Sequence, residues 1–554
     1  MSFKPLGVAC VVVAACVYAI TDVRSAAPRF YPDDPITVDD DRQVDVGEVD
    51  EVELDDYYDF LENSLGTPGD RSNIRALNVN TLDEVPDSSW FTNRIGRQEM
   101  SVAELVQGPD QADVRLGTDW TIVRGKNRGF HPGFRAIDRS DPSRTVYQLE
   151  VDPPRHPEMA SGAEVIGTAF YHAFGYHTVE VYLAEIDPAA LEISPEATIR
   201  DANGRRPFVR NDLNEILKNA ARLPNGRIRV TAERFREGED VGRFEYHGTR
   251  ADDPNDIHPH EHRRELRGSR VFAAWLNHDD SRAVNTMVMR HVEDGRGYLK
   301  YYMVDFGSLL GSAPRFPNAA PSGREYTLAG RPSLLTLLSF GVYVRPWLRV
   351  PDTPAPPAVG GFSAEGFDPR TWVAEYPKAA FENMRADDAF WAARIVARFS
   401  NDAIRAIVEK GRYSDPAAVE TLTAALIKRR DRIKEVWLTS INPIVNVTLS
   451  PQGELHFENA VLAYDVGGRP EGYTIRWSRF DNATDTHTAV GDDVMVTGTQ
   501  ASAPVALLTG ADYVSVSIAT RHPAFPAWRP VQVYFRRTAT GWQTVGVDRR
   551  LDAS

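Results

Sequence analysis

Three short motifs near the middle of the chain place carboxylates and an amide where they could hold a metal ion and orient a hydroxyl group. His278 and Asp280 come first, Asn285 follows five residues after the aspartate, and Asp305-Phe306-Gly307 completes the set. A carboxylate can orient an attacking hydroxyl, while Asp and Asn oxygens are ligands that Mg²⁺ accepts. The types and spacing of these residues therefore indicate phosphoryl-transfer chemistry.

Two strands and a tight turn must bring these motifs together. Side chains alternate in character over 286–289 and again over 298–304, with Glu293-Asp294-Gly295 between the two runs. This pattern predicts a β-hairpin, and a helix is predicted over 264–277 in front of it. The open end of such a hairpin would place Asn285 beside Asp305, where one metal ion could bridge the two side chains.

With these motifs at this spacing, the region resembles the atypical branches of the protein-kinase-like superfamily, such as the lipid-kinase, HipA-like and CotH-like groups. The resemblance implies an α+β, two-lobed kinase-like domain that uses ATP and Mg²⁺. By the same resemblance, Asp280 would be the catalytic carboxylate and Arg282 a contact to the transferred phosphate. Asn285 and Asp305 would hold the metal.

The nucleotide-binding half departs from the pattern of the superfamily. The residues that the resemblance assigns to the nucleotide are Gly125, Lys126, Gly129 and Glu164. The strand predicted over 144–151 carries Glu150 where the superfamily has a lysine that pairs with the helix glutamate. Lys126 or Arg124 could supply the missing charge from the Gly-rich turn. Alternatively, the nucleotide binds in another orientation, as in kinase-like proteins that transfer AMP, or the domain is a pseudokinase that only binds.

The expected activity is therefore Mg-ATP-dependent transfer to a hydroxyl group of an envelope protein or polymer. The rival from another class is an inactive scaffolding or binding protein. The chain has a net charge of −15, but fourteen acidic residues and a single arginine lie between Asp33 and Glu62. The rest is nearly neutral and offers no basic face, which argues against nucleic-acid binding. The acidic run itself is expected to be a solvated, disordered spacer.

The N-terminus has the pattern of an export signal. Lys4 precedes an apolar run over 6–20, which is short for a membrane span. Val13-Ala14-Ala15-Cys16 resembles the lipobox of bacterial lipoproteins, in which the cysteine carries the lipid. Cleavage near Ser25-Ala26-Ala27 and an uncleaved anchor are the alternatives. The chain is accordingly expected in the periplasm or outer cell envelope, held at a membrane by this segment or by a lipid on Cys16.

Composition and periodicity divide the chain into five parts. An immunoglobulin- or fibronectin-like β-sandwich is predicted at the C-terminal end, from short alternating runs separated by turn residues, with a strand over 505–508 among them. The longest helices are predicted over 157–174, 388–406 and 417–437, and Gly175 is placed to end the first of them. The expected parts are a signal segment (1–27), an acidic spacer (28–85), a β-rich N-lobe with insertions (86–262), a helical C-lobe (263–441) and the β-sandwich (442–554).

Overall fold

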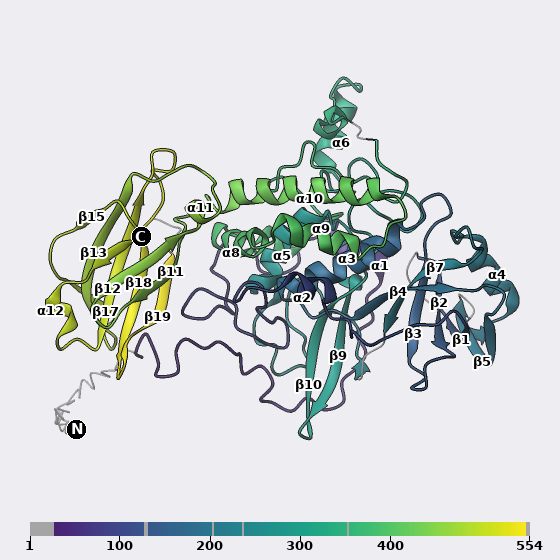
Figure 1. Ribbon diagram of the computed structural model, residues 1–554, viewed down its shortest axis with the longest axis horizontal. Helices are drawn as coiled ribbons and strands as arrows, with labels where there is room; N and C mark the ends of the chain where they lie inside the picture. The colour runs from purple at the N-terminus through teal and green to yellow at the C-terminus, as the bar shows by residue number, and fades with distance from the viewer. Residues whose placement is uncertain (1–26, 127–130, 202–203, 235–237, 352–353, 550–554) are drawn as a thin grey trace, which may run out of the picture.

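The computed structural model describes residues 27–549 apart from 127–130, 202–203, 235–237 and 352–353. The described chain mixes helices with several β-sheets, which confirms the fold class at the level of mixed helix and strand. In Figure 1 a seven-stranded sheet lies on the right, a helical region in the middle and a C-terminal β unit (442–549) on the left. Within the described residues, no helix combines the length and apolarity that crossing a bilayer requires. The predictions for the first 26 residues, including Cys16, lie outside the described part.

The seven-stranded sheet follows the order β4-β7-β3-β2-β1-β5-β6. Helix α3 (Met159–Phe174) packs against β3, β4 and β7, while α4 (Arg210–Lys218) contributes Leu213 and Leu217 to the core of the sheet. Gly175 ends α3 with φ of 130°, a conformation that favours glycine, as predicted. The strands are β1 (Trp120–Gly125), β2 (Gly133–Asp138), β3 (Val146–Val151), β4 (Glu180–Ile186), β5 (Glu192–Asp201), β6 (Gly204–Pro207) and β7 (Ile228–Arg234).

The predicted hairpin is present as β9 (Thr286–Glu293) and β10 (Arg296–Met303). Asp294 and Gly295 both have positive φ, at 51° and 76°, as a tight two-residue hairpin turn requires. The strands pair in register along their whole length, so Thr286 faces Met303 at the open end. Two-residue β8 (Glu239–Asp240) pairs with the outer edge of β9.

Helices form the middle of the molecule around the largest hydrophobic core, to which α3 also belongs. The prediction of one helix over 388–406 is wrong, because the chain breaks at Phe399 and Ser400. Ser400 accepts a hydrogen bond from the Ala403 backbone at 3.1 Å and so starts a new helix as its N-cap. The helices of this region are α2 (Val102–Gln107), α5 (Arg264–Leu276), α7 (Ala379–Glu382), α8 (Ala386–Ala397), α9 (Asn401–Glu409) and α10 (Pro416–Trp437), with 3₁₀ turns at His260–His262 and Ala283–Asn285.

The C-terminal β unit consists of two sheets that share one hydrophobic core, with Trp477 buried in it. The strand predicted over 505–508 is wrong: these residues form the short helix α12 (Val505–Leu508), which directly follows Pro504. One sheet contains β11 (Ile444–Leu449), β12 (Glu454–Asn459) and β16 (Gln500–Ser502). The other contains β13 (Gly472–Asp481), β14 (Thr486–Ala489), β15 (Val494–Val496), β17 (Tyr513–Arg521), β18 (Val531–Thr538) and β19 (Gly541–Arg549). A one-turn helix, α11 (Ala460–Ala463), follows β12.

A long, mostly irregular segment separates β10 from α7. It carries α6 (Gly330–Leu338) and a 3₁₀ turn at Pro346–Arg349. Figure 1 shows α6 standing away from the body of the molecule, above α10. We call residues 312–351 the protrusion.

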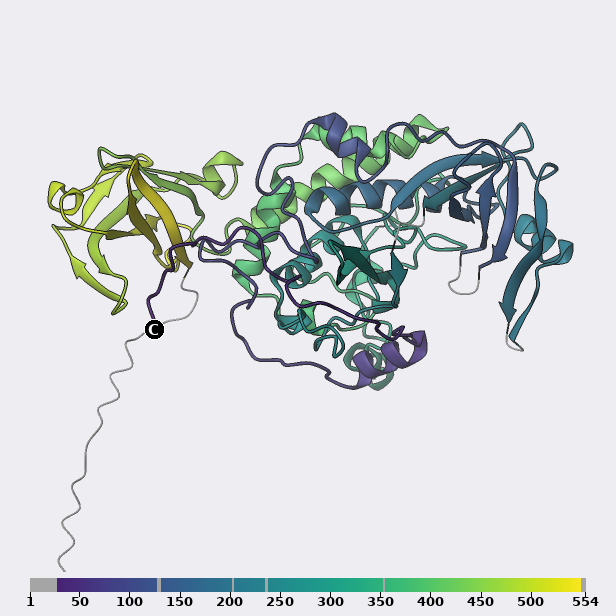
Figure 2. The ribbon, with the colours of Figure 1, turned by 90° about the horizontal axis from the view of Figure 1, so that it is seen from below.

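The expectation of a disordered N-terminal spacer is wrong for the described residues, although most of its acidic side chains are exposed to solvent, as expected. Residues 27–87, called the strap here, run from the C-terminal β unit along the helical region, as Figure 2 shows in purple. Val46 is buried and hydrogen-bonds Gly297 on β10, and Val52 forms a bridge with Gly242. Apolar residues between the acidic ones therefore anchor the strap, and α1 (Asp56–Leu65) forms within it.

Candidate functional site

The hairpin brings the last two motifs together at its open end. The Val304 backbone N–H donates to the Asn285 carbonyl at 3.2 Å, which sets Asn285 next to the Asp305-Phe306-Gly307 segment. Phe306 is fully buried and stacks on Tyr171 of α3, with ring centroids 4.5 Å apart. Asp305 itself has φ of 62°, a left-handed conformation that is costly for a residue other than glycine and is common at functional sites.

The loop after α5 is held by its own backbone and by α3. Asn277 ends α5 in a left-handed conformation, and buried His278 hydrogen-bonds the Tyr171 hydroxyl through Nδ1 at 2.7 Å. Burial, together with nearby Lys378, lowers the pKa of His278 to about 3, so this imidazole is neutral and structural. The Asn285 side-chain amide donates to the Asp280 carbonyl at 2.7 Å, which fixes the loop to the start of the hairpin.

Asp280 and Arg282 form an ion pair within this loop. The Arg282 Nε atom lies 2.6 Å from the Asp280 carboxylate, and its Nη2 atom lies 2.5 Å from Glu375. Burial raises the pKa of Asp280 to about 7; Arg282 opposes the shift and the charge of Asp305 adds to it. A carboxylate with a pKa near 7 is suited to accept a proton from a hydroxyl group.

A second group of carboxylates faces the loop from the sheet and α3. Glu150 lies on β3, Glu164 on α3 and Glu233 on β7. Burial raises the pKa of Glu233 to about 7 and that of Glu164 well above its ordinary range; in both cases Asp305 and Glu150 add to the shift. We call Glu150, Glu164, Glu233, Asp280 and Asp305 the acidic centre.

Lys126 reaches the acidic centre from the end of β1. Its Nζ atom forms an ion pair with Glu150. Burial alone would lower the pKa of Lys126, but the carboxylates of Glu150 and Asp305 raise it overall, so the side chain stays charged. A small cavity lies beside this pair, lined by Glu150, Glu164, His131 and Gly307 among others. Lys126 thus places a positive charge beside Glu150, although β3 itself carries no lysine.

The structure thus gathers six of the eight residues singled out in the sequence: Lys126, Glu164, Asp280, Arg282, Asn285 and Asp305. Gly125 has a packing reason of its own, because a Cβ atom there would lie 2.7 Å from the Ile199 side chain on β5. Gly129 lies outside the described residues.

Sequence reasoning missed Lys378. This buried side chain donates to the Ser281 hydroxyl at 2.5 Å and lies 4.6 Å from the ring centroid of Phe381. Burial lowers its pKa to about 7, against the opposing effect of Asp59 and Asp280. The one available signal was the lysine itself, which follows Tyr376-Pro377 just before α7. Glu233 and Glu375 gave no signal, because nothing in the sequence places β7 or residue 375 beside the loop.

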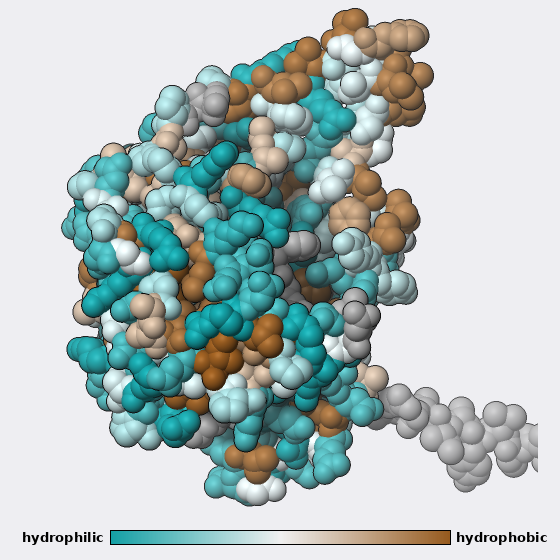
Figure 3. Space-filling model, turned by 90° about the vertical axis from the view of Figure 1, so that its right-hand side faces the viewer, coloured by the Kyte–Doolittle hydropathy of each residue, from teal (hydrophilic) through white to brown (hydrophobic). Residues whose placement is uncertain are grey.

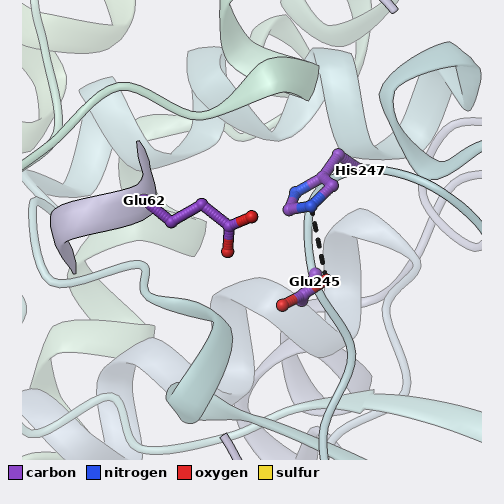
Figure 4. Close-up of side chains that lie close together, drawn as sticks. All are labelled: Glu62, Glu245 and His247. Atoms are coloured by element: carbon purple, nitrogen blue, oxygen red, sulfur yellow. Dashed lines mark ion pairs between the residues drawn. The ribbon is translucent and has the colours of Figure 1, made fainter. Parts of the chain in front are cut away.

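A separate cluster of possible metal ligands joins α1 to the helical region. Ligand atoms of Glu62, Glu245 and His247 lie within 4.8 Å of one another, and Figure 4 shows all three side chains pointing together. His247 Nε2 lies 3.3 Å from the Glu245 carboxylate. Burial raises the pKa of Glu245; the imidazole opposes the shift and Glu62 adds to it. Among the described His, Cys, Asp and Glu residues, this is the only group of three or more whose ligand atoms all lie within 4.8 Å of one another.

A cleft larger than the cavity beside Glu150 lies away from the acidic centre. It has a volume of about 830 Å³ and lies at the base of the protrusion, where Glu325, Trp347 and Arg429 contribute to its walls. It meets the loop after α5 at Asn277, whose side-chain amide donates to Ser322 at 3.0 Å.

Comparison of the chain with protein-family models, with curated proteins and with solved structures gave no match. The functional argument therefore depends on the site itself.

Proposed function

We propose that the protein is a kinase-like transferase that uses a nucleotide and Mg²⁺ to modify a hydroxyl group on an envelope protein or polymer. The observation that carries the proposal is the acidic centre: Asp280 and Asp305, from two separate motifs, lie across from Lys126 and three glutamates. The proposal includes a two-lobed kinase-like fold for the sheet and helical regions and an immunoglobulin-like sandwich for the C-terminal β unit. It also includes export and membrane attachment.

The acidic centre offers oxygen donors of the kind that Mg²⁺ takes, although among the described residues its carboxylates do not approach one another as closely as Glu62, Glu245 and His247 do. Lys126 pairs with Glu150 and Arg282 with Asp280, so the five carboxyl groups of the acidic centre outnumber the two cations beside them. The raised pKa values of Asp280, Glu164 and Glu233 reflect that excess together with burial. One carboxylate oxygen of Asp280, Oδ1, is buried without a hydrogen-bond partner and relies on the Arg282 ion pair. Oxygen donors short of positive charge are the preferred environment of Mg²⁺.

Asn285 and Asp305 would hold the metal, which neutralises phosphate charge when it is bound. Asp280 would orient the hydroxyl group and take up its proton. Arg282 is held between Asp280 and Glu375, so we assign it first to positioning Asp280 and second to the phosphate. Lys126, paired with Glu150, would take the part of the strand lysine in kinases.

Nucleotide binding is the step to test first. Thermal unfolding of the full chain should shift upward with Mg-ATP, because a ligand at 100 times its Kd stabilises by about 2.7 kcal/mol. For a chain of this size that corresponds to a rise in Tm of roughly 2 °C. Asp305→Asn should abolish the magnesium-dependent part of the shift, while Asp492→Asn, at an exposed site, should leave it intact.

An unchanged Tm at millimolar Mg-ATP would refute the nucleotide site and favour the scaffolding alternative. A shift that persists in Asp305→Asn and does not require Mg²⁺ would refute the metal assignment alone.

The Lys126–Glu150 pair also favours a second candidate, transfer of AMP. The lysine comes from the end of β1 and pairs with a strand glutamate, so the phosphates can meet it in a different orientation from that in kinases. Incubation with ATP labelled at either the α- or the γ-phosphate separates the two. Label from the γ-phosphate on a protein or polymer acceptor supports phosphoryl transfer, and label from the α-phosphate supports AMP transfer.

A further inference from the structure

Large apolar side chains are concentrated on the protrusion. Of the 28 large hydrophobic residues that are exposed in the described part of the chain, ten lie between positions 316 and 348. Phe340 is 97% exposed and Val342 82%, and α6 has no buried residue. In Figure 3 the hydrophobic colour gathers at the top of the molecule, where the protrusion stands away from the body. The ten are Phe316, Leu328, Leu334, Leu335, Leu337, Leu338, Phe340, Val342, Val344 and Leu348.

Specific contacts fix the base of the protrusion and so hold its exposed apolar residues in one arrangement. Arg345 pairs with Glu325 at 2.6 Å, and Trp347 donates its indole N–H to the same carboxylate at 2.5 Å. Above this base, Phe340 and Gly341 both have positive φ, at 50° and 84°, which makes a sharp reversal after α6. The tip therefore exposes Leu337, Leu338, Phe340 and Val342 around one turn.

The protrusion is basic, contrary to the expectation that the chain outside the acidic run has no basic face. Residues 312–351 contain five arginines and one glutamate, a net charge of +4, whereas the whole chain carries −15. The arginines are Arg315, Arg324, Arg331, Arg345 and Arg349. An apolar tip flanked by arginines complements an interface that is apolar inside and negatively charged at its surface. A bilayer that contains anionic lipids has that structure.

We propose that the tip of the protrusion inserts into the surface of a membrane rich in anionic lipids. This is a second attachment, separate from the segment at the start of the chain, and it does not depend on the nucleotide site. The 830 Å³ cleft at the base of the protrusion then lies next to the lipid surface. An exposed apolar patch on a folded protein is a recognised sign of such a binding site.

A fluorescent label that responds to an apolar environment can report insertion at one position. The chain has two cysteines, Cys10 and Cys16, so their replacement by serine in the full chain leaves a single introduced cysteine for labelling. Phe340→Cys places the label at the tip. Val505→Cys, at a residue 76% exposed on α12 of the C-terminal β unit, is the matched control. Because the signal is local, attachment by the N-terminal segment cannot imitate it.

Vesicles with 30% phosphatidylglycerol should increase the emission at position 340 several-fold and shift it to the blue. Pure phosphatidylcholine vesicles should do so weakly, and the label at position 505 should not respond. In unlabelled protein, Phe340→Ser with Leu337→Ser should weaken binding to anionic vesicles at least tenfold, since each side chain contributes about a factor of ten on burial. The same variant should keep the Tm shift with Mg-ATP.

Three results would overturn the proposal. No change at position 340 with anionic vesicles excludes insertion. An equal change at positions 340 and 505 shows nonspecific adsorption. A rise at position 340 without vesicles, growing with protein concentration, shows that the tip binds a second copy of the chain.

Discussion

Replacement of Lys126 by methionine tests whether this lysine balances the acidic centre. Methionine keeps a similar length and loses the charge, so Glu150, Glu164, Glu233 and Asp305 remain without the nearest ammonium group. Removal of one partner of a buried ion pair costs about 3–5 kcal/mol. Lys126 and Glu150 have 16% and 21% of their side chains exposed, which brings the expected loss down to about 3 kcal/mol at pH 8.5.

The loss should depend on pH with a definite sign. Burial and the neighbouring carboxylates already raise the pKa of Glu233 to about 7 from an ordinary 4.5, and Lys126 is a group that holds it down. Without Lys126 this pKa rises further. A group with a raised pKa in the folded protein binds its proton more tightly there, so the folded state gains stability as pH falls through that pKa. Each unit by which the variant raises this pKa corresponds to about 1.4 kcal/mol, so the loss should be smaller at pH 6 than at pH 8.5 by about 1 kcal/mol.

Urea unfolding at pH 6 and pH 8.5 measures the difference, and hydrogen exchange in peptides from β1 to β3 shows whether it is local to the sheet. Lys428→Met is the matched control, because Lys428 is 67% exposed and lies 4.0 Å from Glu365; its effect should stay below about 0.5 kcal/mol. The double variant Lys126→Met with Glu150→Gln should recover about half of the loss. An equal loss at both pH values, or none at all, would refute the electrostatic role assigned to Lys126.

Three further variants probe other parts of the fold, each by urea unfolding. Asp83→Asn should cost about 3–5 kcal/mol at pH 7, since Asp83 pairs with buried Arg264 at 2.8 Å. Arg264 holds the pKa of Asp83 far below its ordinary value despite burial, so the cost of the substitution should shrink as pH falls below about 4. Gly167→Ala would put a Cβ atom 2.2 Å from a methyl group of Leu309, so it should lower the free energy of unfolding by about 1–3 kcal/mol and weaken Mg-ATP binding. Gly498→Ala is the control, because a Cβ atom there meets open space. Lys378→Met should stabilise the fold by about 1–2 kcal/mol at pH 7 but not at pH 9, because burial lowers the pKa of Lys378 to about 7 and the protonated lysine is costly in the fold.

Local patterns were enough to predict the elements that frame the site. The hairpin was predictable because Asp294-Gly295 strongly favours a two-residue turn between alternating strands. Helices α3, α5 and α10 were predictable from apolar residues at intervals of three and four, and Gly175 marked an end. The position of Asn285 beside the Asp305 segment then follows from the register of the hairpin alone.

The contacts of the acidic centre could not be predicted, because they join residues that are distant in the sequence. The Lys126–Glu150 pair arises because β1 and β3 lie on either side of β2, an order that a single sequence does not reveal. Glu233 joins the acidic centre only because β7 inserts between β3 and β4. Ser400 interrupts a good helical pattern because its side chain competes for a backbone N–H, an effect too local for periodicity to reveal.

The strap was mispredicted for a related reason. Its composition is that of a disordered segment, and its apolar residues have no regular spacing. They find partners only on surfaces made by other parts of the chain: Phe30 packs against Phe480 and Tyr534 of the C-terminal β unit, with ring centroids 5.9 and 5.1 Å apart.

The path of the strap also means that its first residues depend on partners made much later in synthesis. Arg29 pairs with Asp548, a residue 519 positions later, and Phe30 donates its backbone N–H to Asn482. Synthesis begins at the N-terminus, so these early residues have no docking partners until β13 and β19 have been made. The dense acidic charge between Asp33 and Glu62 suits that interval, because mutual repulsion keeps a waiting segment soluble and prevents it from collapsing onto incomplete partners. The N-terminal part of the strap can therefore dock only after the C-terminal β unit has formed.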